Sequence, residues 1–307
     1  MPPANTQAYS VPSIFVIIPT YNRKAITLQC LEYLSGQEKN ISLQLVVVDD
    51  GSTDGTVSAI HAQYPQVQVL KGDGNLWWAG AIKKGMQYAH KQGASHVIWL
   101  NDDTLPAERT LFLLVQACTQ DPRKIVSAQC YDSADFQVPT YGGHRKKMFA
   151  LQYLFVPEGK QIRCDCMSGN LVCIPCSVID RIGYPLNHKL PQSLADVVYT
   201  WEAQKAGYQL EVIGDAKAIC KFNPLEQGWL ISSTPIIQQW KRLRGPKSNF
   251  YPPAYWHYCK SFYGYLALIP FLHVYFKLLV ITIIRWILPA SVILKVRLYK
   301  NKFNARF

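Results

Sequence analysis

The chain has 307 residues, of which 49% are hydrophobic and 17% are charged. A chain of this length and composition can bury a sizeable core, which excludes a largely disordered protein. The net charge of +12 is confined to one end: residues 241–307 contain twelve lysines and arginines and no acidic residue, whereas residues 1–240 contain twenty of each kind. This local basic field indicates a separate electrostatic role for the C-terminal part.

The first ten residues are polar and have neither a basic start nor an apolar run, so no secretory signal peptide is expected and the protein is predicted to stay on the cytoplasmic side. The nine cysteines are then expected to be reduced thiols. Cys164, Cys166, Cys173 and Cys176 form two close pairs, but their spacing and apolar surroundings favour buried side chains over a zinc site.

Short β-rich apolar runs alternate with stretches at helical spacing over the first 130 residues. The expected strands are 14–18, 43–48, 67–70, 96–100 and 125–129, and the expected helices are 24–35, 53–64, 77–91 and 107–119. This alternation predicts an α/β fold with a mostly parallel sheet flanked by helices. Ligands bind such sheets beyond the carboxyl ends of the strands, where this sequence has Pro-Thr-Tyr-Asn, Asp-Asp-Gly-Ser and Asn-Asp-Asp.

The pattern loosens after the fifth strand. Residues 131–174 are expected to form irregular or antiparallel strands that shape an acceptor pocket. A helix is predicted over 194–206, followed by a strand at 209–213 and a second at 217–222.

Two acidic clusters follow predicted strands. Asp50 and Gly51 lie on a tight glycine turn, where a carboxylate can accept the imide proton of uracil or thymine or bind ribose hydroxyls, or can simply cap the next helix. The second cluster consists of Asn101, Asp102 and Asp103. These hard oxygen ligands suit a Mg²⁺ or Mn²⁺ ion that bridges a diphosphate, and the alternative is a polar turn that caps the following helix.

Asp196 lies near the start of the predicted helix 194–206. It is placed either as a base that deprotonates an acceptor hydroxyl or as a first-turn aspartate that complements the helix dipole.

Four motifs in order carry a resemblance to a known family. VIIPTYNR (16–23), VVVDDGSTDGT (46–56), LNDDT (100–104) and ADVVYTWEAQKAGY (195–208) resemble the successive motifs of family 2 glycosyltransferases, over residues 13–222. The segment GDGNLWWAGA, residues 72–81, is similar to one in rhamnosyltransferase-like members.

The resemblance implies a GT-A fold, in which Asp50 holds the base, Asp103 is the principal metal ligand with Asp102 beside it, and Asp196 is the catalytic base. The nucleotide-sugar site implied is formed by Pro19, Thr20, Tyr21, Asp50, Gly51, Asn75, Gly80, Asn101 and Asp102. The chain departs from the family pattern with Asn101 in place of an aspartate, Lys83 in place of an asparagine, Ala195 in place of an acidic residue and Cys220 near a metal-binding histidine.

Acceptor candidates come from two further places. Trp77 and Trp78 have aromatic faces that pair with the apolar faces of sugars, although they can equally anchor the helix that they begin. Gly169 and Asn170 lie in a turn of the looser segment and complete the expected acceptor site.

The C-terminal segment is apolar from 261 to 294 but is interrupted by Pro270, Lys277, Arg285 and Pro289. Its longest charge-free stretch, residues 261–276, is shorter than the ~20 residues that a span requires, which favours helices lying in the membrane interface with their cations at the headgroups. A single span over 261–284 is the alternative within a membrane. A helical cap packed on the catalytic domain, or a dimer interface, is the alternative outside one.

The sequence therefore predicts a flexible N-terminus (1–12), a GT-A domain (13–225) and a basic, apolar, membrane-associating helical segment (226–307). The expected reaction is an inverting transfer from a dTDP- or UDP-sugar to a lipid-linked glycan in cell-surface polysaccharide synthesis, with Mg²⁺ or Mn²⁺, at the cytoplasmic face of an anionic membrane. A homodimer is left open and nucleic acid is not an expected partner. The rival interpretations are a nucleotidyltransferase that forms sugar nucleotides and a non-catalytic basic protein that binds membrane or nucleic acid.

Overall fold

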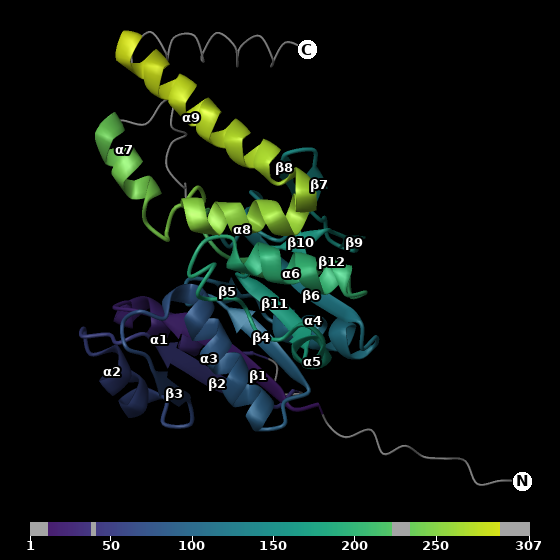
Figure 1. The fold of residues 1–307 in the computed structure, drawn as a ribbon. Helices are drawn as coiled ribbons and strands as arrows, with labels where there is room; N and C mark the ends of the chain where they lie inside the picture. The colour runs from purple at the N-terminus through teal and green to yellow at the C-terminus, as the bar shows by residue number, and fades with distance from the viewer. Residues whose placement is uncertain (1–11, 38–40, 223–233, 289–307) are drawn as a thin grey trace, which may run out of the picture.

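The computed structural model describes residues 12–37, 41–222 and 234–288 (Figure 1). Among these residues nine strands form one mixed sheet in the order β3-β2-β1-β4-β11-β6-β12-β5, and β9 also pairs with β12. Its strands are β1 (Ile14–Thr20), β2 (Leu43–Asp49), β3 (Gln68–Lys71), β4 (His96–Leu100), β5 (Leu105–Pro106), β6 (Lys124–Tyr131), β9 (Gln161–Arg163), β11 (Leu171–Pro175) and β12 (Gln209–Ile219). The predicted α/β fold with a mostly parallel core is confirmed: β1 pairs in parallel with β2 and β4, and β6 pairs in parallel with β12.

Helices cover both faces of this sheet because alternate residues of a strand point to opposite sides. On one face Val16 and Ile18 pack with α1 (Lys24–Ser35), α2 (Thr56–Gln63) and α4 (Thr110–Thr119). On the other face Phe15 and Ile17 pack with α3 (Trp77–Lys91), α5 (Ser177–Ile182) and α6 (Ala195–Lys205). The central strands are therefore buried on both sides, which is why they read as unbroken apolar runs.

A smaller sheet stands beyond the main one. It has the order β10-β7-β8, made of β10 (Cys166–Met167), β7 (Gly143–Lys147) and β8 (Ala150–Leu154), and its pairs are antiparallel. The prediction of antiparallel strands between 131 and 174 is confirmed.

Three of the predicted elements differ most from the structure. Helix α2 begins at Thr56, three residues late, because the Asp54 carboxylate accepts the Thr56 N–H and holds the preceding turn. Helix α4 begins at Thr110, because Leu105–Pro106 pairs with β12 as an edge strand. The two strands expected after residue 209 are one strand, β12, with an irregularity between Ile213 and Lys217.

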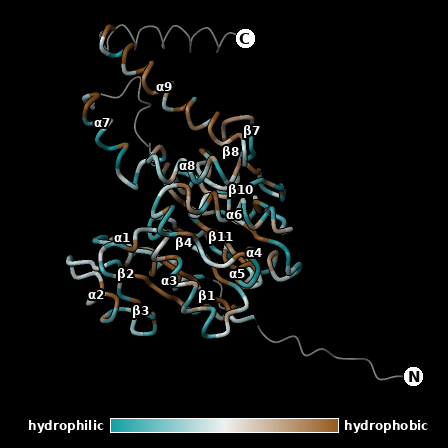
Figure 2. The backbone as a smooth tube through the Cα atoms, in the orientation of Figure 1, coloured by the Kyte–Doolittle hydropathy of each residue, from teal (hydrophilic) through white to brown (hydrophobic). Residues whose placement is uncertain are grey.

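The C-terminal helices divide into a packed part and a protruding part. Helix α8 (Pro252–Tyr263) packs on α6, with the Trp201 and Phe262 rings stacked 4.4 Å apart and the Trp201 indole N–H donating to the Ser261 carbonyl. Helix α9 (Leu268–Ile287) follows the short η1 (Gly264–Leu266) and extends away from the domain, with apolar residues along its length (Figure 2). In the described part of the chain it is the one helix long and apolar enough to cross a membrane.

The interruption expected at Pro270 in the C-terminal apolar segment is not observed. Pro270 is the third residue of α9, where its missing N–H would have no partner within the helix, and the helix continues through Lys277 and Arg285. One alternative from the sequence is a helical cap packed on the catalytic domain. Helix α8 is packed in this way, because it shares a core with α6. Three predicted features lie outside the described residues: the N-terminal segment 1–12 except residue 12, the domain boundary at 225, and the basic residues beyond 288.

Candidate active site

The three polar clusters predicted at the strand ends lie at one edge of the sheet. The main-chain N–H of Asp50, after β2, donates to the carbonyl of Thr20 at the end of β1, at 2.9 Å. The Thr20 hydroxyl donates to Asp102, after β4, at 3.1 Å. The order β2-β1-β4 brings these ends together because all three strands run in the same direction.

Asp50 is buried and organises the loop that leads into α3. Its Oδ1 accepts the N–H groups of Gly74 and Leu76, at 3.0 and 3.1 Å, and its Oδ2 accepts the N–H of Trp77 at 3.0 Å. The first turn of α3 is thus capped by a carboxylate from another strand. Gly72 permits this approach, because a Cβ there would lie 2.6 Å from Asp50 Oδ1.

Arg23 binds both aspartates of the second acidic cluster. One guanidinium nitrogen lies 2.7 Å from Asp102 Oδ1 and the other 2.9 Å from Asp103 Oδ2. The other oxygen of Asp102 also accepts hydrogen bonds from the hydroxyls of Thr20 and Thr27. Burial raises the pKa of Asp102 to about 6, although Arg23 opposes the rise.

Asp103 differs from Asp102 in being open to solvent. Its side chain is 44% exposed, against 3% for Asp102. Asp102 is therefore a buried structural anion, whereas Asp103 presents a carboxylate to solvent.

Asp196 is partly buried in the first turn of α6. Its Oδ2 accepts the Gly169 N–H at 2.6 Å and its Oδ1 accepts the Val197 N–H at 2.8 Å. Burial raises the pKa of Asp196, and these two main-chain hydrogen bonds oppose the rise. A carboxylate with a raised pKa is a stronger base once it is ionised.

Trp77 and Trp78 connect the three acidic groups. The Trp77 N–H binds Asp50, and the Trp78 indole N–H donates to Asn101 Oδ1 at 2.8 Å, next to the second acidic cluster. The Trp78 ring also lies against Gly169, where a Cβ would be 2.5 Å from the ring and 3.0 Å from the Asp196 Cβ. Both tryptophans are half-buried, and these contacts give them a structural role besides the acceptor role that the sequence predicts.

The other predicted residues lie around this frame. Tyr21 and Asn75 are exposed, whereas Pro19 and Gly80 lie on β1 and in the buried face of α3. Gly51 takes a positive φ of 80° at the turn after β2. Asn170 is buried and joins the second acidic cluster to the end of β12. Its main-chain carbonyl accepts the Asn101 N–H, and its side-chain amide donates to Cys220 Sγ at 3.2 Å.

The donor set fits a divalent cation that shares a carboxylate with a diphosphate. No group of three or more His, Cys, Asp or Glu side chains arranged to hold a metal occurs within the described residues, so a closed protein cage is not present there. Mg²⁺ and Mn²⁺ in nucleotide enzymes commonly take one or two carboxylates and complete their shell with phosphate and water, which the open Asp103 permits. Burial raises the pKa of Cys220 to about 11, so this thiol stays protonated and is a poor ligand for such ions.

Sequence reasoning missed two groups at the site. Arg23 belongs to the motif at 16–23, but its fork between two aspartates needs tertiary structure to be seen. Tyr153 on β8 carries no sequence signal, yet its ring packs on His144, which lies 2.8 Å from the hydroxyl of Ser168, the residue before Gly169.

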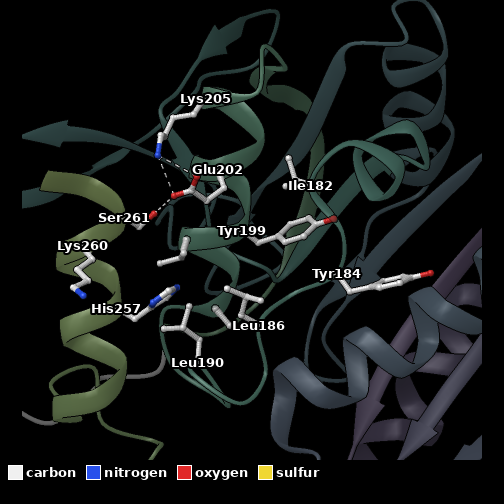
Figure 3. Close-up of a pocket in the computed structure, with 12 residues that line it drawn as sticks. Ile182, Tyr184, Leu186, Leu190, Tyr199, Glu202, Lys205, His257, Lys260 and Ser261 are labelled. Atoms are coloured by element: carbon white, nitrogen blue, oxygen red, sulfur yellow. Dashed lines mark hydrogen bonds and ion pairs between the residues drawn. The ribbon is translucent and has the colours of Figure 1, made fainter. Parts of the chain in front are cut away.

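A cavity of about 430 Å³ lies on a different face of α6, between α6 and α8 (Figure 3). It is lined by apolar side chains such as Leu190 and Tyr199 and by polar ones such as Glu202 and His257. None of the predicted site residues lines it, because Asp196 points from another side of the helix.

The mixed sheet with helices on both faces and acidic groups at the strand ends is that of a GT-A-type domain, the fold of the similar solved structures given below. Residues 15–174 match the family described as Glycosyl transferase family 2, and the chain belongs to this family. Rhamnosyltransferase-like membership within it stays a prediction.

The proteins similar to this chain include a curated relative and several solved structures. An N-acetylglucosaminyltransferase of Bradyrhizobium elkanii is 30% identical over 117 residues, which is 36% of this chain and 62% of the relative. The chain thus spans less than two thirds of that relative.

The solved structures are similar in fold. A mannosyltransferase from Pyrobaculum calidifontis in complex with GDP-Man and Mn²⁺ has a TM-score of 0.56 and 19% identity, over 95% of this chain and 81% of that one. GalNAc-T7 with UDP, GalNAc and Mn²⁺ has a TM-score of 0.58 and 14% identity, over 85% of this chain and 54% of that one. S. aureus TarS in complex with UDP has a TM-score of 0.51 and 16% identity, over 67% and 59%.

Proposed function

We propose that this protein is an inverting glycosyltransferase that moves a sugar from a dTDP- or UDP-linked donor to a hydroxyl of an acceptor. One observation carries the proposal: Asp50, the pair Asp102–Asp103 and Asp196 are all connected through the Trp77–Trp78 segment. Three acidic groups far apart in sequence thus surround one edge of the sheet, where a sugar nucleotide would meet all three.

Asp196 acts as the base in this proposal. Each of its oxygens accepts one main-chain hydrogen bond and keeps a lone pair for the acceptor hydroxyl. The acceptor oxygen attacks the anomeric carbon as its proton passes to Asp196, and the bond between that carbon and the diphosphate oxygen breaks. The raised pKa of Asp196 favours this proton transfer.

Asp50 fixes the nucleoside end of the donor in two ways. It holds the 74–77 loop through three N–H groups, and its carboxylate has about four acceptor positions, so one remains for a base or ribose donor. Pro19, Thr20 and Tyr21 complete this end, at the neighbouring strand. The similarity of residues 72–81 to rhamnosyltransferase-like members favours dTDP-sugars among the donors to be tested.

Asp103 is the proposed ligand of a Mg²⁺ or Mn²⁺ ion, with Asp102 held behind it by Arg23. Such an ion, when bound, would offset the negative charge on the departing diphosphate. Two of the similar solved structures contain Mn²⁺.

Helix α9 is proposed to lie in the interface of an anionic membrane, at the cytoplasmic face. Its outward residues are apolar, including Leu272, Phe276 and Ile283. Its C-terminal half binds α7 (Ile236–Leu243): the Trp240 indole donates to Thr282, and Arg285 donates to Gln239.

These α7 contacts favour the interface over a span. If α9 crossed the bilayer, α7 would enter the hydrocarbon with Lys241 and Arg242, at a cost of about 3 kcal/mol for each cation. Lying in the interface keeps both cations at the headgroups, where each gains about 1 kcal/mol. A membrane-bound enzyme of this kind suits a lipid-linked glycan acceptor, and assembly of a cell-surface polysaccharide is the proposed process.

The test is a panel of UDP-, dTDP- and GDP-sugars with Mg²⁺ or Mn²⁺ and a membrane-lipid extract as acceptor. The proposal expects release of nucleoside diphosphate from a UDP- or dTDP-sugar that depends on the extract, with inversion at the anomeric carbon. The mechanism would be contradicted by retention of configuration at the anomeric carbon. It would also be contradicted by release of nucleoside diphosphate that depends neither on the extract nor on either ion.

A further inference from the structure

Four aromatic rings gather at the end of β8 and after β12, on elements outside the family motifs. Tyr153 and Phe155 lie two residues apart at the end of β8, with parallel rings (interplanar angle 4°) whose centroids are 6.3 Å apart. Phe222, after β12, meets Tyr153 edge-on at 6.0 Å and stacks on Tyr141 at 5.5 Å. Tyr153, Phe155 and Phe222 remain 38%, 50% and 48% exposed, which leaves a fixed but open aromatic surface.

A continuous set of contacts connects this surface to the proposed base. The Tyr153 ring lies 4.6 Å from the ring of His144, its partner on β7, and His144 Nε2 lies 2.8 Å from the Ser168 hydroxyl. Ser168 precedes Gly169, whose N–H binds Asp196. His144 is buried, and it connects Tyr153 to the segment whose main chain binds the proposed base.

The other end of the surface reaches the metal side of the site. Phe222 follows Cys220 by two residues, and Cys220 accepts the amide N–H of Asn170. The rings therefore border the side of the site formed by β8 and the end of β12. The proposed nucleoside residues, at the ends of β1 and β2, lie on the other side.

These rings suit a sugar better than a nucleotide or a lipid. Aromatic faces pair with the apolar C–H faces of pyranose rings, and side chains fixed by neighbouring rings lose little freedom on binding. A run of exposed aliphatic side chains, which suits acyl chains, lies on α9 instead, for example Leu272 and Ile283.

We propose that Tyr153, Phe155 and Phe222 form the acceptor subsite, a platform on which a sugar ring of the acceptor glycan stacks with its hydroxyl directed to Asp196. This inference rests on the proposed function and names the surface that receives the acceptor. It replaces Trp78 as the stacking residue, because that indole is already held by Asn101 and Gly169.

The test is saturation-transfer NMR on the full-length protein in detergent with UDP and Mg²⁺. The probes are methyl glycosides of glucose, N-acetylglucosamine, mannose and rhamnose, together with chitobiose and cellobiose. We expect saturation of ring C–H protons in at least one probe, and a dissociation constant raised about tenfold in Tyr153→Ala and Phe222→Ala. Tyr153→Phe keeps the ring and is expected to bind like the wild type.

Tyr33→Ala is the matched control, since Tyr33 is 40% exposed on α1, away from the platform. The inference is overturned if the wild type binds none of these sugars, or if the two ring deletions leave the dissociation constant unchanged. Release of nucleoside diphosphate from the donor panel, measured separately, decides the proposed function. A wild type that releases it with unchanged acceptor affinity in the ring variants contradicts the platform alone.

Discussion

Arg23 holds two carboxylates with different surroundings. It pairs with the buried Asp102 and the exposed Asp103, and their charges raise the pKa of the guanidinium although burial acts against this rise. The planar fork of arginine can reach both partners at once, which the point charge of lysine cannot do. Arg23 thus keeps Asp102 ionised behind the residue proposed to bind the metal.

Replacing Arg23 by alanine is expected to destabilise the protein by about 1–3 kcal/mol at pH 8, because it leaves the buried Asp102 carboxylate without its cation. The pKa of Asp102 is already raised to about 6, above the usual value of an aspartate, so its ionisation costs stability as the pH rises through that value. The loss should therefore shrink at pH 5, where Asp102 is protonated. Denaturant unfolding at both pH values measures it, with the exposed Arg123→Ala as control, and an equal loss at both would contradict the pairing.

Gly169 occupies a position that admits no larger residue. A Cβ there would lie 2.5 Å from the Trp78 ring and 3.0 Å from the Asp196 Cβ, and neither neighbour is the free end of a flexible chain. Gly169→Ala should lower the rate of sugar transfer at least tenfold by displacing Asp196. Gly36→Ala, where the nearest atom is 3.6 Å away, is the control. Wild-type turnover in Gly169→Ala would show that this contact does not position the base.

The pH dependence of transfer follows from the burial of Asp196. Burial raises its pKa, and only the ionised form can accept a proton, so kcat/KM should fall with decreasing pH at a value above the ordinary ~3.9 of aspartate. Nucleotide affinity measured over the same range should not follow this curve. An acid limb at or below pH 4 would argue against Asp196 as the base.

At the scale of elements, the two C-terminal helices α8 and α9 differ in what surrounds them. Helix α8 contributes Tyr255, Tyr258 and Phe262 to a core shared with α6, so it belongs to the catalytic domain. Helix α9 buries little more than Pro270, Leu278 and Thr282. The short turn at Gly264 separates the two, and the outward residues of α9, such as Leu272 and Phe276, are exposed.

Leu272→Ser combined with Phe276→Ser should reduce binding to vesicles of mixed neutral and anionic lipid at least tenfold, since both side chains are exposed on α9. Vesicle flotation in low and high salt is the measurement. The wild type should stay bound in high salt, because apolar insertion is not screened. Val138→Ser, an exposed apolar site in the catalytic domain, is the control, and unchanged flotation of the double variant would exclude α9 as the anchor.

For the whole molecule, the sequence predicts the elements whose pattern is local. The buried runs of β1, β2 and β4 and the spacing of α3 are recognisable because each repeats over a full element. The predicted start of α2 is three residues early, because the Asp54 side chain accepts the Thr56 N–H and keeps the preceding residues in a turn. Helix α9 was expected to be interrupted because the position of Pro270 within the first turn depends on where η1 ends.

The site was predictable in its acidic residues but not in what surrounds them. Asp50, Asp103 and Asp196 stand in motifs, and the convergence of Asp50 and Asp103 follows from the order of β2, β1 and β4. The contacts of Trp78 with Asn101 and Gly169 span 23 and 91 positions of the chain, and the aromatic platform joins β8 to the end of β12. Contacts of this kind arise from tertiary packing and leave no local pattern.

The measurement that tests the account most directly compares Asp196→Asn with Asp180→Asn, an exposed aspartate on α5. Asparagine keeps the size of the side chain but cannot take up a proton, so sugar transfer should fall by at least a thousandfold while the donor dissociation constant stays within about threefold of the wild type. The Asp180 variant should match the wild type in both. Sugar transfer at the wild-type rate in Asp196→Asn would contradict the account, because the acceptor hydroxyl would then lose its proton elsewhere.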